Sequence, residues 1–171
     1  MHIKKIVVGF LYTNCYAIIN EKKEAIVIDP GAEGDEIISF LKPYKVVEIL
    51  VTHHHHDHVG ALKQLEQHYN LKENEHTSHF KYEVIKTPGH TSDSLSFYFP
   101  EIETVFTGDF IFKNTIGRMD FGGNEHDMKK SLQMFLDKFK NQLDLYPGHG
   151  ETTTLEEERK LLQIIEKHLK L

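Results

Sequence analysis

The stretch Thr52-His53-His54-His55-His56-Asp57-His58-Val59-Gly60 holds six contiguous residues of the kinds that bind metal ions. It directly follows residues 46–51, a run that is apolar except at one position and rich in β-branched side chains, which predicts a buried strand. An apolar pattern with helical spacing comes after it, at Leu62, Leu65 and Tyr69. The stretch is therefore expected to form a strand-to-helix loop, and a merely solvated histidine loop is a poor explanation for it.

The spacing of the histidines allows two registers. If the backbone is extended, residues two apart point to the same side, so His53 and His55 can face one ion while His54 faces away. Asp57 and His58 come next, at the mouth of the helix, where they can face a second ion. A register that uses His54, His56 and His58 has the same spacing, and geometry alone leaves it open.

Three further residues of ligand type each follow an expected strand. They are His90 in Pro88-Gly89-His90-Thr91, Asp109 in Thr107-Gly108-Asp109, and His149 in Pro147-Gly148-His149-Gly150. Sheet proteins hold their sites in the loops at the carboxyl ends of strands, so we expect these residues to converge. A turn histidine bonded to a main-chain carbonyl is the alternative for His90 or His149 taken alone, and the shared strand-Pro-Gly-His context argues against it.

The donor types indicate the chemistry of the expected site. Imidazole and carboxylate suit zinc, iron or manganese, and a chain whose single cysteine is Cys15 lacks the thiolates of a closed structural zinc site. Seven candidates are too many for one tetrahedral ion and fit two, with Asp109 bridging. They are His53, His55, Asp57, His58, His90, Asp109 and His149. Two ions that share a water lower its pKa from about 15.7 toward about 7, so the set predicts metal-assisted hydrolysis.

The rest of the pattern predicts sheets covered by helices. Strands are expected at residues 3–9, 15–19, 25–29, 46–51, 82–87, 95–99, 104–107 and 143–146. Helices are expected at 34–42, at 128–139 with Asn124 or Asp127 as the cap, and after a capping box of Thr154 and Glu157. The expected helices lie between strands without regular alternation, so the fold class is α/β or α+β. The 171 residues fit a single domain over 1–171.

Composition excludes several classes of protein. A hydrophobic content of 39% with 27% charged residues excludes disorder for most of the chain, and a dispersed net charge of −6 argues against a nucleic-acid surface. No apolar run approaches the roughly 18 residues that cross a bilayer, and the first residues lack the pattern of a secretory signal. We expect a cytoplasmic protein with a small-molecule substrate and neither nucleic acid nor membrane as a partner; the oligomeric state stays open.

In the order of its motifs, the chain resembles the metallo-β-lactamase superfamily. The HxHxDH signature of that family matches residues 53–58. The Asp29-Pro30-Gly31 turn before it and Pro88-Gly89-His90-Thr91, Gly108-Asp109 and Gly148-His149 after it occur in family order. The resemblance implies a four-layer αβ/βα sandwich and resolves the register. It places one metal ion on His53, His55 and His90 and the other on Asp57, His58 and His149, with Asp109 shared.

Within the superfamily, Thr107-Gly108-Asp109 followed by Gly117-Arg118-Met119-Asp120-Phe121 is similar to the glyoxalase II group, the hydroxyacylglutathione hydrolases. The short bacterial forms, which lack a carboxy-terminal helical domain, are the most similar. The resemblance implies thioester hydrolysis by a metal-bridging hydroxide, with two divalent ions, zinc first and iron or manganese as alternatives. Asp57 is then the catalytic residue that orients the hydroxide, and Arg118 contacts the substrate.

Two departures from the group affect the expected site. Asp120 and Glu151 stand at positions that are aromatic in the group, and only 28 residues separate His58 from Thr87. We therefore expect a shortened segment before Thr87 and an open, shallow site.

Two alternatives to the hydrolase accompany this interpretation. The Gly-Arg-x-Asp-Phe stretch is also similar to the persulfide dioxygenase branch, in which one iron on the His53, His55, His90 and Asp109 positions would activate oxygen. The other alternative is a degenerate metal-binding protein without catalysis.

Overall fold

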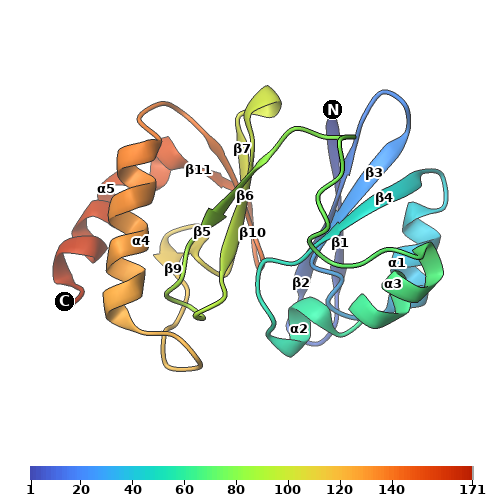
Figure 1. Cartoon of the computed structure of the whole chain (residues 1–171). Coiled ribbons are helices and arrows are strands. Elements are labelled where there is room, and N and C mark those ends of the chain that lie inside the picture. The colour runs from blue at the N-terminus through green and yellow to red at the C-terminus, as the bar shows by residue number, and fades with distance from the viewer. Residues whose placement is uncertain (171) are drawn as a thin grey trace. The chain divides into compact units, whose positions relative to one another are not determined.

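The first sheet is formed by the early strands of the chain in the order β1-β2-β3-β4 (Figure 1). The structure is a computed structural model that describes residues 1–170, and Met1–Lys81 form one of its two compact units. β1 (His2–Val8), β2 (Thr13–Ile19) and β3 (Glu24–Ile28) pair antiparallel. β4 (Lys45–Leu50) pairs parallel to β3, because α1 (Gly34–Leu41) carries the chain back along the sheet. The carboxyl ends of β3 and β4 therefore lie side by side, at the edge of the sheet where these strands end.

Two helices follow β4 in this unit, α2 (His56–Val59) and α3 (Leu62–Tyr69), and α3 contacts both α1 and β4. Alternate residues of β2 and β3 form the core with these helices, since successive strand side chains point to opposite faces. That core includes Cys15, Ala17, Ile19, Ala25, Val27, Ile37, Leu41 and Leu65. Burial and the nearby charge of Asp29 raise the pKa of the Cys15 thiol, so this cysteine packs as a small apolar side chain.

The second unit, from Tyr82 on, has a sheet in the order β11-β10-β7-β6-β5. β5 (Glu83–Lys86), β6 (Leu95–Phe99) and β7 (Thr104–Gly108) pair antiparallel in succession, with the 3₁₀ turn η1 (Pro100–Ile102) between β6 and β7. β10 (Asp144–Pro147) pairs parallel to β7, and β11 (Thr153–Thr154) pairs antiparallel to β10. β5, β7 and β10 therefore run in the same direction and end at the same edge.

Helices α4 (Glu125–Lys138) and α5 (Leu155–His168) pack against each other in this unit (Figure 1). The short strands β8 (Ile111–Phe112) and β9 (Thr115–Ile116) form a small hairpin after β7. The core of the unit comprises apolar residues of both helices and of the sheet, among them Val105, Phe110, Met128, Leu132, Phe135, Leu145, Leu155 and Leu162. Among residues 1–170, none of the helices is long and apolar enough to cross a bilayer.

The predicted α+β class is confirmed, as are the long strands and the caps of the last two helices. Asn124 caps α4 by accepting from the Asp127 main-chain N–H at 2.8 Å, and Thr154 caps α5 by accepting from Glu157 N–H at 3.2 Å. The predicted capping box is confirmed only in its Thr154 half. The Glu157 carboxylate, expected to accept from the Thr154 main-chain N–H, accepts from the Thr153 hydroxyl at 2.9 Å instead. Periodicity did not predict α2, β8, β9 or β11, which are too short to show a period. The single domain over 1–171 stays a prediction.

Candidate metal centre

Asp29 organises the edge of the first sheet where β3 and β4 end. Its carboxylate accepts from the Thr52 main-chain N–H and from the Thr52 hydroxyl, both at 2.7 Å, and lies 2.9 Å from His58 Nδ1. Asp29 follows β3 and Thr52 follows β4, so the parallel pairing of the two strands brings them together. Asp29 is 2% exposed and has a φ of 54° in the left-handed region, a conformation that these three bonds hold in place.

The same bonds fix the tautomers of His53 and His58. A carboxylate only accepts, so His58 Nδ1 donates to Asp29. The Thr52 hydroxyl gives its proton to Asp29, so its oxygen accepts from His53 Nδ1 at 3.1 Å. Both rings therefore carry their proton on Nδ1, which makes Nε2 the ligand atom, and such partners are typical of metal-binding histidines. The two rings are buried, with centroids 4.1 Å apart.

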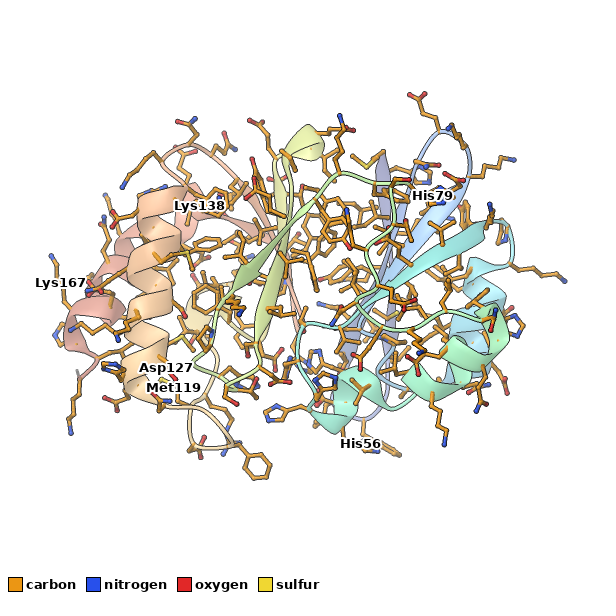
Figure 2. All side chains as sticks on the ribbon, in the orientation of Figure 1. His56, His79, Met119, Asp127, Lys138 and Lys167 are labelled. Carbon is orange, nitrogen blue, oxygen red and sulfur yellow. The ribbon has the colours of Figure 1, made fainter. Side chains whose placement is uncertain are left out.

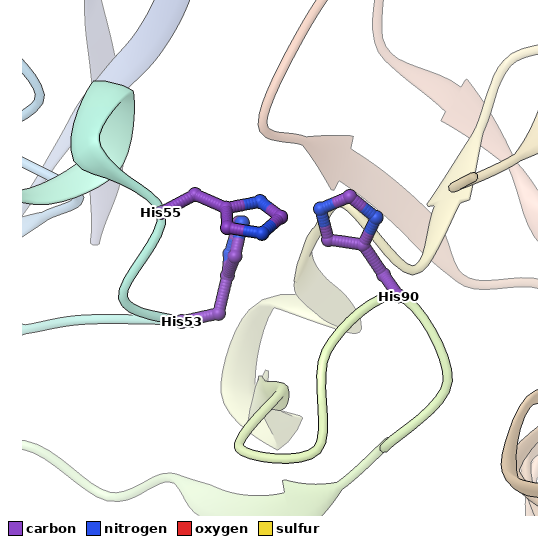
Figure 3. Close-up of side chains that lie close together, drawn as sticks. All are labelled: His53, His55 and His90. Atoms are coloured by element: carbon purple, nitrogen blue, oxygen red, sulfur yellow. The ribbon is translucent and has the colours of Figure 1, made fainter. Parts of the chain in front are cut away.

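His55 and Asp57 add two more side chains of ligand type to this cluster of the first unit. The His55 and His53 rings meet edge to face with centroids 4.8 Å apart, and Figure 3 shows both side chains on the stretch after β4. The Asp57 Oδ2 atom accepts from the Thr13 hydroxyl at 3.0 Å and lies 3.4 Å from His58 Nε2. Thr13 begins β2, which is antiparallel to β3, so its amino end lies at the same edge of the sheet.

The remaining histidines of the stretch face outward. His54 is exposed and its Nε2 lies 3.0 Å from the Glu73 carboxylate. His56 is exposed as well, at the start of α2 (Figure 2). Of the two registers that spacing left open, the structure thus has His53 and His55 turned in, as the family resemblance implies.

The second unit brings together three predicted residues at the edge where β5, β7 and β10 end. His90 Nε2 lies 3.5 Å and His149 Nε2 lies 3.4 Å from the same oxygen, Oδ2 of Asp109. His90 Nδ1 lies 2.7 Å from the main-chain carbonyl of Arg118, which can only accept, so Nδ1 carries the proton and Nε2 is the ligand atom. His90 stands on the loop after β5 (Figure 3).

Glycines let main chain approach these ligands closely. A Cβ on Gly117 would lie 1.8 Å from the Asp109 carbonyl oxygen and 3.2 Å from His90 Cβ. A Cβ on Gly89, whose φ is +152°, would lie 2.6 Å from Met128 Cα in α4. The β8–β9 hairpin and the start of α4 can therefore pack against the ligand loops only if both positions are glycine.

The Arg118 side chain, which is predicted to contact the substrate, is paired with Asp120 in the structure. Its exposed guanidinium donates two hydrogen bonds to Asp120, at 2.7 and 2.6 Å. These bonds lower the pKa of Asp120 to about 2 and raise that of Arg118. Glu151, at the other position that is aromatic in the glyoxalase II group, pairs with Lys113 Nζ at 2.5 Å. Asp120 and Glu151, the two acidic residues at these positions, thus each pair with a basic side chain.

The donor set fits divalent cations. Each predicted ligand lies in one of the two units, with His53, His55, Asp57 and His58 in the first and His90, Asp109 and His149 in the second. Imidazole nitrogens and carboxylates without thiolate suit zinc, iron or manganese, and three of the imidazoles already have Nδ1 engaged. Sequence reasoning gave no role to Thr13 or Thr52 and noted Asp29 only as part of a turn. Their roles depend on strand pairing, which no local pattern reveals.

Comparison with known proteins identifies the family. The sequence model of the metallo-beta-lactamase superfamily matches residues 8–81 and 73–151, which together are most of the chain. This chain belongs to the metallo-β-lactamase superfamily. An uncharacterized protein of Aquifex aeolicus is 32% identical, over 93% of this chain and 94% of that protein. The hydroxyacylglutathione hydrolase GloC of Haemophilus influenzae is 28% identical, over 94% of this chain and 96% of its own length.

Several solved structures show the same fold. The B3 metallo-beta-lactamase BLEG-1 has a TM-score of 0.89 at 26% identity, covering 96% of this chain and 99% of that one. A protein crystallised in a di-iron-bound form has a TM-score of 0.83 at 26% identity, covering 92% and 97%. ETHE1 from Myxococcus xanthus has a TM-score of 0.82 at 26% identity, covering 100% and 92%. The predicted metallo-β-lactamase fold is thereby confirmed.

The shortened segment before Thr87 is also confirmed. The alignment with GloC extends over 203 positions, more than the 171 residues of this chain, so the relative carries insertions. The two family matches meet at residues 73–81. Between α3 and β5, residues 70–82 contain only an isolated bridge, Ile49↔Glu73.

Proposed function

We propose that this superfamily member is a thioester hydrolase acting on substrates of the hydroxyacylglutathione type. The observation that carries the proposal is the arrangement of ligand atoms in each unit: His58 Nε2 lies 3.4 Å from Asp57 Oδ2 in the first, and His90 Nε2 and His149 Nε2 converge on Asp109 Oδ2 in the second. The thioester is supported by the likeness to GloC, which is named a hydroxyacylglutathione hydrolase and aligns over 94% of this chain.

In this proposal the two halves share a pair of divalent cations. His53, His55 and His90 would hold one ion, Asp57, His58 and His149 would hold the other, and Asp109 would be a ligand available to both. When bound, such ions lower the pKa of a shared water toward about 7 and polarise the substrate carbonyl. Zinc is the first choice for these donors, with iron and manganese as alternatives, and iron is supported by the di-iron form of a similar protein.

The chain's own residues position the reacting groups. Asp57 is the proposed catalytic residue, which orients the attacking water, and the Thr13 hydroxyl at 3.0 Å holds its Oδ2 atom in place. Asp29 accepts from His58 Nδ1, and the Arg118 carbonyl accepts from His90 Nδ1. These bonds orient both rings and leave Nε2 as the ligand atom. The Arg118 guanidinium would contact an anionic part of the substrate once Asp120 releases it. A small-molecule substrate, with neither nucleic acid nor membrane as a partner, and a cytoplasmic location complete the proposal.

The first experiment measures metal content and activity on one sample. The full chain is purified without added metal, its zinc, iron and manganese are quantified, and a thioester panel is assayed that includes lactoylglutathione and non-glutathione thioesters. Near two zinc ions per chain with thioester turnover is the expected result. One iron per chain with oxygen uptake on glutathione persulfide would replace the proposal with the dioxygenase activity. Bound metal without any turnover would favour a degenerate metal-binding protein.

Adjacent histidines provide a matched pair of variants. His55→Ala removes a proposed ligand and is expected to lower kcat at least about 100-fold with loss of bound metal. His56→Ala makes the same chemical change at the exposed neighbour and should leave activity and metal content unchanged. Equal activity of the two variants would overturn the proposed ligand register.

A further inference from the structure

The outer edge of β4 is covered by a short piece of chain instead of another strand. β4 is the last strand of the first sheet, and the segment after α3 reaches it with one parallel bridge, Ile49↔Glu73. The Asn74 main-chain N–H then donates to the Ile49 carbonyl at 2.8 Å. The shortened segment thus supplies the beginning of a fifth strand and no more.

The Asn74 side chain continues the ladder by one further residue. Its Oδ1 accepts from the Val51 main-chain N–H at 2.9 Å, and its Nδ2 donates to the Val51 carbonyl at 3.3 Å. Val51 is 1% exposed and is the first residue beyond β4, so its main-chain groups need partners. A primary amide has one acceptor and a donor group side by side, like the peptide unit of a neighbouring strand. The Asn74 main chain turns away with a φ of 54°, which leaves this task to the side chain.

Val51, which the Asn74 amide holds, directly precedes the stretch that carries the histidines. Thr52, the next residue, is bonded to Asp29 through its N–H and hydroxyl, both at 2.7 Å. The chain is therefore held from both sides at residues 51 and 52, by Asn74 at the sheet edge and by Asp29 on the side of His58. His53 and His55 follow directly from this fixed point.

We propose that Asn74 is a positioning residue for the metal ligands His53 and His55, acting through the main chain of Val51. The inference rests on the proposed function only in that these histidines hold a divalent cation. It assigns a task to the shortened segment, which contacts the edge of β4 through one bridge and one side-chain amide.

Neighbouring contacts hold Asn74 in position. Glu73 Oε2 lies 3.0 Å from His54 Nε2, which keeps the intervening histidine turned outward. On the other side, the Thr77 main-chain N–H donates to the buried Glu48 carboxylate at 2.9 Å, and the Thr77 hydroxyl bonds to the same oxygen. The segment is thus attached to β4 or to the histidine stretch before and after Asn74.

Asn74→Gly is the direct test, because glycine accepts the left-handed φ and removes only the amide. Asn70→Gly is the matched control, since Asn70 has a φ of 53°, is exposed and lies just upstream in the same segment. The dissociation constant for Zn²⁺ is measured on the full chain by competition with a chromophoric chelator. Asn74→Gly is expected to bind Zn²⁺ about 10-fold more weakly, the lower end of the effect of losing a supporting partner, with Asn70→Gly close to wild type.

The absorption spectrum of the Co²⁺-loaded chain gives a second readout that stability alone does not change. Asn74→Gly should shift its ligand-field bands, while Asn70→Gly should not. Asn74→Asp keeps the acceptor for the Val51 N–H but sets a carboxylate oxygen against the Val51 carbonyl, so it should also bind Zn²⁺ more weakly and serves if the glycine variant does not fold.

The outcomes separate this inference from the proposed function. Unchanged Zn²⁺ affinity and Co²⁺ spectra in both Asn74 variants would overturn the positioning role, as would loss of the fold in both, which would make Asn74 purely structural. A wild-type chain that binds no Zn²⁺ would overturn the metal site itself. Absence of thioester turnover in a chain that binds Zn²⁺ would overturn the proposed substrate and leave the Asn74 result standing.

Discussion

Asp29 is buried and accepts hydrogen bonds from the Thr52 N–H, the Thr52 hydroxyl and His58 Nδ1. Asp29→Asn keeps the shape but turns a donor amide toward groups that themselves donate. We expect the free energy of unfolding of the metal-free chain to fall by about 2 kcal/mol, the cost of a buried donor left unsatisfied. Urea unfolding measures this change.

The control for Asp29→Asn is Asp35→Asn in the same unit, where the exposed carboxylate accepts from Gln64 Nε2 at 2.7 Å. An exposed substitution of this kind should change the unfolding free energy by no more than about 0.5 kcal/mol. Equal effects at the two positions would contradict the central role of Asp29.

A second prediction at the residue scale concerns pH. Hydrogen bonds from Arg118 lower the pKa of Asp120 from 3.8 to about 2. Because the folded pKa is the lower one, any stabilisation from this pair is complete above pH 3.8 and is lost as the pH falls toward 2. The ¹³C carboxyl resonance of Asp120 should titrate near pH 2 and move up toward 3.8 in Arg118→Ala. A midpoint that Arg118→Ala leaves unchanged would contradict the pairing.

The pair of Arg118 and Asp120 is also expected to affect the KM for the proposed substrate. At neutral pH Asp120 is ionised and holds the Arg118 guanidinium, so Asp120→Asn should release a positive charge on the residue whose main-chain carbonyl bonds to His90. We expect the KM for lactoylglutathione, an anionic thioester, to fall about 3-fold at low salt, an effect of the size of one exposed charge pair, and the difference to shrink as salt rises. Asp137→Asn, which removes an exposed charge paired with Lys140 on α4, is the control for net charge. A KM equally changed in both variants would indicate only a general charge effect.

At the scale of elements, the turn after β3 packs directly on the start of α2. A Cβ on Gly31 would lie 1.8 Å from the Asp57 carbonyl oxygen, which is main chain and cannot move aside cheaply. Gly31→Ala should lower the free energy of unfolding by about 2 kcal/mol through overpacking and weaken Zn²⁺ binding by shifting Asp57. Urea unfolding and chelator competition measure the two effects.

Gly34→Ala is the matched control for that turn. Its Cβ would lie 2.0 Å from Gln64 Oε1, the end of a flexible side chain that can rotate away. A small change is expected there, and an equal loss at both positions would show that the contact with Asp57 is unimportant.

How far the elements could be predicted depended on their length. Residues 46–51 form a long, nearly continuous apolar run, and Met128, Leu132 and Phe135 of α4 recur at helical spacing. Asn124 and Thr154 show their capping role locally. The hairpin of β8 and β9 has two residues per strand, too few for a period. The bridge at Glu73 is a single pairing, so only the folded chain reveals it.

At the scale of the molecule, each unit has its own core and contributes part of the proposed metal centre. If both halves bind the same ions, Zn²⁺ at 100 times its dissociation constant should raise the free energy of unfolding by about 2.7 kcal/mol. Excess EDTA should abolish this increment. Urea unfolding with and without Zn²⁺ measures it.

A variant in the second unit tests whether the halves act together. His149→Ala should reduce the Zn²⁺ increment to about 1.4 kcal/mol or less, as a 10-fold loss of affinity predicts. His168→Ala, at the end of α5 where Nδ1 bonds to the Ile164 carbonyl, should leave the increment intact. An unchanged increment in His149→Ala would contradict a centre shared between the halves.

The sequence alone was enough to predict the types of donor, their place after strands, the α+β class and the family, because these follow from local periodicity and from motifs of adjacent residues. Only the tertiary structure decided that Nδ1 carries the proton in His53, His58 and His90, and what holds the histidine stretch in place. Asp29 and His58 lie 29 residues apart, and Asn74 lies 23 residues from Val51. Such contacts exist only because β3 and β4 pair in parallel and the chain returns along the edge of β4, which is a property of strand pairing and of no local pattern.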